Sequence, residues 1–548
     1  MRKKNSVIKC FVILTFLVSL AFCLNAQIPQ VLWYYDVNDM SFGNAAIGDI
    51  DEDDKLEIVF SCYRNDSSVY ALNAEDGSLL WKKNTGGCND VAPLIYDVDM
   101  DNHPEVIVPS SCVAKTFCLN GLTGNIEWEI NTHGSDSPPT VADVDNDGKP
   151  EILHGEFGGY VICINGENGS QSWEINVDPN SWIQTAPAIL DLDQNGQLDF
   201  VVANWNFDTA HRIFAYRGDN HNLIWETTLP DDVMYHGTSF ADIDQDGKPE
   251  LVIGSYDATL YVLNGEDGSL LWSYQFTTPS SYIGSPTSIA DLDNDGRYEI
   301  VFFDWYKLGV LSDSGSLKWS YTIPGFASSF RGAAISDIDG DDTLDVVFGT
   351  SLGEVIALNG SNGDLIWSFD LSIHYGSSFD IDHGPVIADF NNDSIIDVFL
   401  VGGHAEYPNT YNNYGRAYAL KAGVGEGPAW PMFRRDVRRS ACVSIDTATS
   451  IIESKNDYIP YFGVFPNPFS HEVNIHIGLK ESSDLVINVY DIRGRLVKVI
   501  MDKKLNNGIH KVRWKGNDHS GHFLPSGCYI IEFKTKNKNY YKKVSKSN

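Results

Sequence analysis

Basic residues are scarce through most of this 548-residue chain. Residues 27–454 contain 66 acidic and only 19 basic residues, a formal charge of −47. Phosphate backbones are bound by clustered lysine and arginine, so this deficit argues against a nucleic-acid partner. Apolar runs long enough to cross a bilayer are also missing after residue 26, which predicts a mature chain without a transmembrane segment.

A nine-residue acidic loop occurs eight times, at intervals of 46 to 52 residues. Its clearest copy runs from Asp143 through Asp145, Asp147 and Gly148 to Glu151. Each copy is followed directly by a short apolar run, and periods of this length are typical of stacked units that bury their faces against one another. Loops 1 to 8, in chain order, are residues 49–57, 97–105, 143–151, 191–199, 242–250, 291–299, 337–345 and 389–397.

The spacing of the oxygen-bearing side chains predicts a cation site in each loop. Side chains at positions 1, 3, 5 and 9, with a backbone carbonyl near position 7, can surround one hard cation, and calcium accepts such an oxygen-only shell of about 6–8 ligands. Several structural calcium ions are therefore expected, which would also offset the crowded negative charge. The predicted ligands are Asp49, Asp51, Asp53, Glu57, Asp97, Asp99, Asp101, Glu105, Asp143, Asp145, Asp147, Glu151, Asp191, Asp193, Asn195, Asp199, Asp242, Asp244, Asp246, Glu250, Asp291, Asp293, Asp295, Glu299, Asp337, Asp339, Asp341, Asp345, Asp389, Asn391, Asp393 and Asp397.

Positions 2 and 6 of the loop support this interpretation over a merely solvated turn. Position 6 is Gly, Asn or Asp in seven loops, as a left-handed backbone requires, and only Ser394 fits poorly. Position 2 is always apolar, which would tether the loop to the core. Loops 3, 5 and 6 are complete, whereas Asn195 in loop 4 and Asn391 in loop 8 predict weaker sites, loop 8 being the weakest.

A second motif begins about 20 residues after the start of each of the first seven loops. Its best copy runs from Leu263 through Gly265 and Gly268 to Trp272, and reads as a strand, a tight turn and a strand. Four strands per period indicate four-stranded sheets repeated around an axis, a β-propeller. The other copies end in Trp81, Trp128, Trp173, Trp225, Trp319 and Trp367.

The two ends of the array predict how the ring closes. Leu32 and Trp33 precede loop 1 as Leu271 and Trp272 precede loop 6, so the N-terminal segment would supply the outer strand of the last repeat. The expected fold is all-β, an eight-bladed propeller over residues 27–443. Seven blades with an irregular eighth repeat remain an alternative, because no clean hairpin follows Leu420.

These motifs resemble known families. The acidic loops are similar to FG-GAP (VCBS-type) repeats of integrin-like propellers, and the Asn-Gly-x-x-Gly-x-x-x-Trp hairpins resemble the tryptophan-docking motifs of quinoprotein-like propellers. Together they cover about residues 31–440. The resemblance implies the fold and calcium, but it implies no activity, because propellers host many functions.

The two ends of the chain predict export. Arg2, Lys3 and Lys4 precede an apolar stretch, so residues 1–26 read as a secretory signal peptide. After a linker at residues 444–460, residues 461–548 become basic and alternate in short strands, the pattern of a small Ig-like β-sandwich. By this pattern alone, the region could be an Ig-like spacer or a carbohydrate module.

The C-terminal pattern also resembles the type A sorting domain of the type IX secretion system, which is the interpretation adopted. The resemblance is carried by Val464–Pro468, Tyr490–Arg495, Gly508–His510, Leu524–Tyr529 and the closing Lys542 and Lys543. It implies a Bacteroidetes-type Gram-negative source and passage through the periplasm. It also implies the secretion machinery as partner, and release from the outer membrane or anchoring at its surface.

Cysteines carry little further information. Seven follow residue 26, an odd number, and no CxxC or cysteine–histidine spacing suggests zinc. Cys62, Cys88 and Cys112 fall on neighbouring blades, so a disulfide among them and buried free thiols are both open.

Strand order puts the acidic loops and the hairpin turns on one face, so the remaining connections must lie on the other. Aromatic and basic residues in those connections could stack on sugars or hold a protein segment, or could pack between blades. The predicted ligand-binding residues are Trp182, Trp205, Tyr235, His236, Trp305, Tyr306, Arg331 and His404, with Tyr282, Phe330, Tyr375 and His383 nearby.

Three functions are compatible with the sequence. The first is a secreted or surface-displayed binding or adhesion protein for a glycan or protein ligand, and it needs no catalytic residues; none is identified. The second is a polysaccharide-acting enzyme resembling rhamnogalacturonan lyases, for which His236, His383, His404 and Arg331 would have to converge. The third, a quinoprotein dehydrogenase, is weakened by the absence of an adjacent-cysteine pair. The first is the interpretation adopted.

Overall fold

The computed structural model describes residues 29–206, 211–231, 237–276, 281–393, 395–406, 409–425, 429, 431–432 and 434–436 of the repeat region. In the C-terminal region it describes 462–465, 473–479, 482–491, 493, 495–506, 508–519, 521–525, 527–534 and 539–546. Two compact units, Met1–Ile452 and Glu453–Asn548, divide the chain. The expected signal peptide (1–26) and linker (444–460) lie outside the described residues, as do Tyr235, His236 and Ser394.

The first unit contains eight four-stranded antiparallel sheets among its described residues, numbered here like the loops they hold. Sheets 1 to 4 are β2 (Ala46–Gly48), β3 (Glu57–Ser61), β4 (Ser68–Asn73) and β5 (Leu79–Asn84); β6 (Leu94–Tyr96), β7 (Glu105–Ser110), β8 (Lys115–Asn120) and β9 (Ile126–Asn131); β10 (Thr140–Ala142), β11 (Glu151–Gly155), β12 (Tyr160–Asn165) and β13 (Gln171–Asn176); and β15 (Ala188–Leu190), β16 (Asp199–Ala203), β18 (His211–Arg217) and β19 (Leu223–Leu229).

Sheets 5 to 8 continue the same order. They are β20 (Ser239–Ala241), β21 (Glu250–Gly254), β22 (Thr259–Asn264) and β23 (Leu270–Gln275); β24 (Ser288–Ala290), β25 (Glu299–Asp304), β26 (Lys307–Leu311) and β27 (Leu317–Thr322); β28 (Ala334–Ser336), β29 (Asp345–Gly349), β30 (Glu354–Asn359) and β31 (Leu365–Asp370); and β32 (Val386–Ala388), β33 (Ile396–His404), β34 (Tyr414–Gly423) and β1 (Gln30–Val37). The connections add β14 (Ser181–Trp182), β17 (Trp205–Asn206), η1 (Pro324–Phe326), α2 (Leu371–Tyr375) and η2 (Thr410–Asn412).

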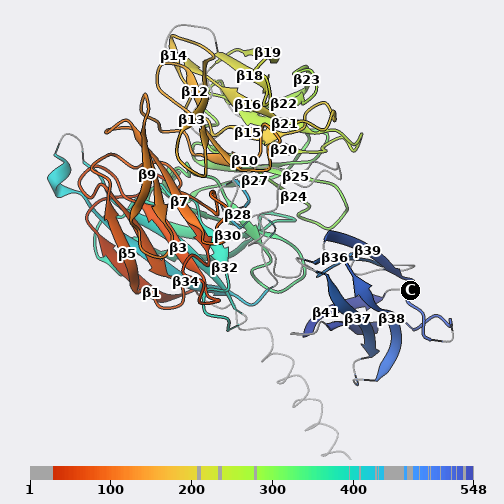
Figure 1. Ribbon diagram of the computed structural model, residues 1–548. Helices are drawn as coiled ribbons and strands as arrows, with labels where there is room; N and C mark the ends of the chain where they lie inside the picture. Colours follow the sequence, from red (N-terminus) through yellow and green to blue (C-terminus); the bar gives the residue numbers. More distant parts are fainter. Residues whose placement is uncertain are drawn as a thin grey trace, which may run out of the picture. The chain divides into compact units, whose positions relative to one another are not determined.

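The expected role of the N-terminal segment is confirmed. Strand β1 pairs antiparallel with β34, so the first described strand completes the last sheet (Figure 1). Each pair of neighbouring sheets shares an apolar cluster, and the one that joins sheet 8 to sheet 1 brings Phe60 within 5.6 Å of Phe399, measured between ring centroids. The sheets are therefore held to one another all the way round.

Five of the tryptophans join their sheet to the next by a hydrogen bond. Trp81 donates its indole N–H to the carbonyl of Gly121 in the following hairpin at 2.6 Å, and Trp33, Trp128, Trp225 and Trp319 make the equivalent bond at 2.7 to 3.0 Å. The turn glycine of the hairpin is required both by its backbone conformation and by its close contact with the docked tryptophan. At Gly268, φ is +68°, and an added Cβ would lie 2.5 Å from the Trp225 ring.

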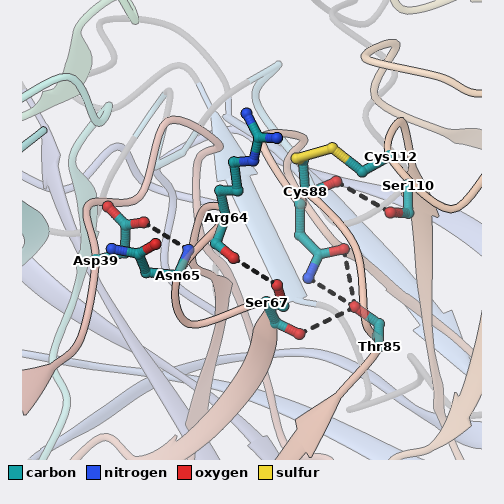
Figure 2. Close-up of a disulfide and its surroundings, with 9 residues drawn as sticks. Asp39, Arg64, Asn65, Ser67, Thr85, Cys88, Ser110 and Cys112 are labelled. Carbon is teal, nitrogen blue, oxygen red and sulfur yellow. Dashed lines mark hydrogen bonds between the residues drawn. A yellow bond between two sulfur atoms is a disulfide. The ribbon is translucent and has the colours of Figure 1, made fainter. Parts of the chain in front are cut away.

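One disulfide, Cys88–Cys112, fastens the connection between sheets 1 and 2 to sheet 2 (Figure 2). Beside it the Ser110 hydroxyl donates to the carbonyl of Cys88 at 3.0 Å. Cys62, the third cysteine of that neighbourhood, is a buried free thiol, as are Cys118 and Cys163. The two alternatives left open by the sequence therefore both occur.

The second unit contains two antiparallel sheets around one apolar core. The first sheet is β35 (Phe462–Phe465), β36 (Val473–Leu479) and β39 (Gly508–Trp514); the second, in spatial order, is β38 (Leu496–Leu505), β37 (Ser483–Asp491), β40 (Gly527–Lys534) and β41 (Asn539–Lys546). Ile475 from one sheet and Ile487 and Phe533 from the other are fully buried in that core. Among the described residues no helix has the length and hydropathy needed to span a bilayer.

The docked tryptophans predict a stability effect. We expect Trp225→Ala to lower the free energy of unfolding by about 3–5 kcal/mol, because a buried ring and its hydrogen bond to Gly265 are both lost. Leu223→Ala, on the same strand but 47% exposed, is the matched control and should cost less than about 0.5 kcal/mol. Urea-unfolding midpoints measure both variants, and equal midpoints would contradict the docking role.

Candidate functional site

Each acidic loop joins the first two strands of its sheet, and its position-9 carboxylate lies at the start of the second strand. In all eight loops this carboxylate accepts a hydrogen bond from the backbone N–H of position 2, at 2.7 to 3.1 Å. The position-9 residues are at most 2% exposed, and so are the apolar side chains at position 2. The expected tether to the core is confirmed.

The other carboxylates of the loop turn inward by the same kind of contact. Position 1 accepts from the N–H of position 6 at 2.8 to 3.3 Å in the seven loops whose position 6 is described. Position 5 accepts from the N–H of position 7 at 2.7 to 3.0 Å in all eight. Position 6 has positive φ in those seven, as expected.

Several inward carboxylate oxygens are buried without a hydrogen-bond partner. They include Oδ1 of Asp49 and Asp242 at position 1 and Oδ1 of Asp345 at position 9. A buried carboxylate oxygen without a donor or a cation is costly. The unpaired oxygens therefore fit a bound cation, and the oxygen-only donor set fits a hard ion such as calcium.

The pKa values of the position-9 carboxylates also favour a bound cation. Burial raises the pKa of Glu57, Glu151 and Glu250 to about 8 and that of Glu105 to about 9, and the aspartates of the same loop contribute to the rise. The backbone N–H of position 2 opposes the shift. Crowded, desolvated negative charge is thus the main strain in these loops, and a divalent cation would relieve it.

In three loops a basic side chain from a strand of the same sheet pairs with the loop carboxylates; in loop 1, Lys55 of the loop itself lies 3.3 Å from Asp53. In loop 4, Arg217 lies 2.5 Å from Asp193 and 3.3 Å from Asp199. In loop 8, Lys421 lies 2.5 Å from Asp393. Arg217 and Lys421 face the position-9 residue across the strand pair, where five other sheets have asparagine: Asn73, Asn120, Asn165, Asn264 and Asn359.

Loop 6 obtains its base from a different strand. Lys318, directly before Trp319 in β27, lies 2.6 Å from Asp293 and 2.9 Å from Glu299. The sequence grouped loop 6 with the complete loops, and Lys318 now separates it from loops 3 and 5. The same place in sheet 2 holds Glu127, which lies with Asp99 and Glu105 so that one oxygen of each is within 4.8 Å of the others. Sequence reasoning missed both residues, although each directly precedes a docking tryptophan.

Position 4 was also missed. It has positive φ in all eight loops, between 57° and 80°. In loops 4, 5 and 6 its side chain reaches the position-6 carbonyl of the next loop: Gln194 donates to Gly247 at 2.6 Å, Gln245 to Gly296 at 3.1 Å and Asn294 to Asp342 at 2.7 Å. Loops 4 to 7 are therefore cross-linked, and the signal was an Asn or Gln at position 4 of these loops.

Those predicted ligand-binding residues that the structure describes lie at the opposite strand ends, in or beside groups of aromatic rings. In group 1, Trp182 and Trp205 meet edge to face at 5.4 Å across the β14–β17 pair, and Phe157 lies 4.6 Å from Trp182. In group 2, Trp305, which is 45% exposed, meets Tyr282 edge to face at 4.7 Å.

The remaining predicted residues flank these groups or form a third. Tyr306 lies 5.5 Å from Phe326, which is 73% exposed, and Arg331 lies over Phe330 at 5.6 Å. Group 3 consists of Tyr375 and Tyr414, stacked at 5.1 Å, with His404 at 5.6 Å from Tyr414. His383, expected near this surface, is only 2% exposed, so it is a core residue and not a surface one.

A surface pocket of about 460 Å³ borders group 3. Ser378, Phe379 and Asp380 line it, and the Tyr414 hydroxyl donates to the carbonyl of Ser378 at 2.6 Å. Asp380 also lies 4.0 Å from His404. Rings beside carboxylate, hydroxyl and carbonyl oxygens are the usual elements of a carbohydrate-binding surface.

Family models match part of the first unit and most of the second. A model of the FG-GAP-like repeat matches residues 143–202, 191–253 and 242–302, and a model of the secretion system C-terminal sorting domain matches residues 463–547. The chain thus contains FG-GAP-like repeats and a type IX sorting domain, as the sequence motifs suggested. The sorting domain indicates export to the cell surface or the medium in Bacteroidetes, through interaction with the secretion machinery.

Solved structures resemble the repeat region in fold. Sqt1 of Saccharomyces cerevisiae is 12% identical with a TM-score of 0.53, the match covering 72% of this chain and 99% of that one. A europium-containing methanol dehydrogenase is also 12% identical with a TM-score of 0.50, covering 72% and 93%. These similarities show a β-propeller fold alone. No curated protein sequence matches the chain.

Proposed function

We propose that this protein is an exported calcium-binding propeller that binds a glycan or protein ligand without catalysing a reaction. The observation that carries the binding role is the set of aromatic groups on the face opposite the loops, with Trp305 and Phe326 exposed by 45% and 73%. Exposed rings that cluster on one face are typical of interaction or ligand-binding sites. Flanking polar groups such as Asp380 favour a carbohydrate among the possible ligands.

The proposal also includes the domain architecture of the chain. Eight sheets, each sharing a core with its neighbours, support an eight-bladed propeller over residues 27–443. The two-sheet second unit supports an Ig-like sandwich over residues 461–548. Residues 1–26 would be removed as a signal peptide, and residues 444–460 would connect the two domains.

Calcium ions would bind in five of the eight acidic loops. Loops 1, 2, 3, 5 and 7 would each hold one ion through their carboxylates at positions 1, 3, 5 and 9, with Glu127 as a further ligand in loop 2. In loops 4, 6 and 8 the bases Arg217, Lys318 and Lys421 take the place of an ion. Arg217 and Lys421 lower the pKa of Asp193 and Asp393 respectively, which is the effect expected of a cation in contact with a carboxylate.

Calcium removal gives the first test. With the full chain in excess EGTA, we expect the melting temperature to fall by at least about 10 °C, because each well-filled site contributes about 2–3 kcal/mol. Re-addition of calcium should restore it, and magnesium should restore less, since it demands a stricter geometry. Scanning calorimetry gives the values, and an unchanged melting temperature would refute structural calcium.

Replacing the basic side chains Arg217 and Lys318 gives the second test. We expect Arg217→Asn and Lys318→Ser each to raise the number of bound calcium ions by one, because each frees two carboxylates. The reciprocal change Glu127→Lys should lower the number by one. Lys115→Ala, which removes a surface base paired with Glu129, is the matched control. Native mass spectrometry counts the bound ions. A constant count across the folded variants would contradict the proposal that a basic side chain takes the place of a calcium ion.

Ligand binding is tested with the calcium-loaded full chain on a glycan array, with parallel incubation of candidate polysaccharides. We expect binding with intact sugars, and a loss of about tenfold or more in Trp305→Ala, equivalent to about 1.4 kcal/mol. Leu317→Ala, on the same sheet and 42% exposed, controls for surface change. New unsaturated ends would instead establish lyase activity, and silence in both assays would point to a protein ligand.

A further inference from the structure

Three potential metal ligands meet away from the acidic loops, where sheets 2 and 3 adjoin. His133 follows the end of β9, Glu156 follows the end of β11, and Glu174 lies in β13. Strand β11 begins at Glu151 of loop 3 and ends at Gly155, so Glu156 is at the opposite end of the strand from that loop. The group therefore shares no residue with the repeated loops.

Glu156 is the unusual member of the group. It is 0% exposed, and neither oxygen of its carboxylate has a hydrogen-bond partner. Burial, and then the charge of Glu174, raise its pKa to about 8; the nearby backbone N–H of His133 acts against this without completing a hydrogen bond. Unlike the carboxylates of loops 4, 6 and 8, it has no lysine or arginine against it among its described contacts. A fully buried carboxylate in this state is costly unless a cation accompanies it.

The other two residues place their ligand atoms where such a cation would be. His133 Nε2 lies 3.5 Å from Glu174 Oε1, and one ligand atom from each of the three residues lies within 4.8 Å of the other two. Two ligands of a tetrahedral zinc ion, each about 2.0–2.1 Å from the metal, are about 3.4 Å apart. The Glu156 oxygen lies within 4.8 Å of the other two ligand atoms and would move closer to them to complete a shell of this size.

The surroundings favour a metal site over a simple ion pair. The His133 ring is stacked on Tyr160 at 4.2 Å with 9° between the planes, which fixes the direction of its nitrogen. The side chains of His133 and Glu174 are 46% and 23% exposed, so an ion can enter from solvent while Glu156 closes the site from inside. A fixed imidazole, an inner carboxylate and an open outer side are common features of zinc sites with a water ligand.

We propose that His133, Glu156 and Glu174 bind one divalent transition-metal ion, with zinc as the best fit and water as the fourth ligand. The imidazole separates this site from the loops, because calcium and magnesium prefer oxygen ligands, whereas imidazole suits zinc and its neighbours in the first transition row. The site would pin the edge of sheet 3 to the end of sheet 2.

The test is zinc titration of the full chain by calorimetry, in excess calcium so that the acidic loops are filled. We expect one zinc ion to bind, and Glu156→Gln and His133→Ala to weaken it more than about 100-fold, since even groups behind the ligands commonly change metal affinity 10- to 100-fold. His522→Ala is the matched control, because His522 is an exposed histidine 3.6 Å from a single carboxylate, Asp518. Zinc binding that survives both site variants would overturn the proposal, as would no binding to the parent chain.

A stability measurement keeps the test decisive if a variant folds poorly. Without zinc and above pH 8, Glu156→Gln should melt at a higher temperature than the parent, because above its pKa of about 8 Glu156 carries an uncompensated buried charge. With zinc, the parent should gain stability and Glu156→Gln should not. A zinc-dependent rise of the same size in both chains would count against the site.

Discussion

The hydrogen bond from the backbone of position 2 to the buried carboxylate of position 9 is the contact on which each repeat depends. It closes the acidic loop, fixes the start of the second strand, and holds an apolar side chain such as Ile50 in the core. It also leaves negative charge in a desolvated place, where a carboxylate is stable only with a counter-charge. With the calcium binding proposed above, every sheet would be tied to a cation, either an ion or a basic side chain of the protein.

The regular part of the structure could be predicted from local sequence patterns. The spacing of Asp143, Asp147 and Glu151 indicates the loop, and the run from Gly265 to Trp272 indicates the hairpin, since both are set by contacts within nine or ten residues. The completion of sheet 8 by β1 could also be predicted, because Trp33 repeats the end of the hairpin motif without its beginning. Repetition made these signals strong.

The exceptions could not be predicted in the same way, because they depend on which residues face one another across strands. Lys318 reaches Asp293 from 25 residues away, through the register of β26 and β27, and nothing near Asp293 in the sequence indicates this contact. The aromatic groups are a similar case. Trp182 and Trp205 were each identified as surface residues, but only the pairing of β14 with β17 brings the rings together.

The two ends of the strands are built on different principles. At one end Gln194, Gln245 and Asn294 connect neighbouring loops, so that movement of one loop is resisted by the next. At the other end the connections differ from sheet to sheet, and include the β14–β17 pair and helix α2. Variable connections on a rigid scaffold are the usual place for binding residues.

Glu299 of loop 6 and Glu156 are both buried carboxylates, but they differ in the counter-charge beside them. Glu299 is buried as deeply as the other position-9 residues, yet Lys318 opposes the rise in pKa that burial causes, and the structure thereby supplies its counter-charge. Glu156 is equally buried, but it faces another carboxylate and an imidazole with one nitrogen directed at Glu174. A protonated His133 could pair with Glu174, but this would leave the buried Glu156 carboxylate without a counter-charge of its own. The proposed metal ion would contact all three groups.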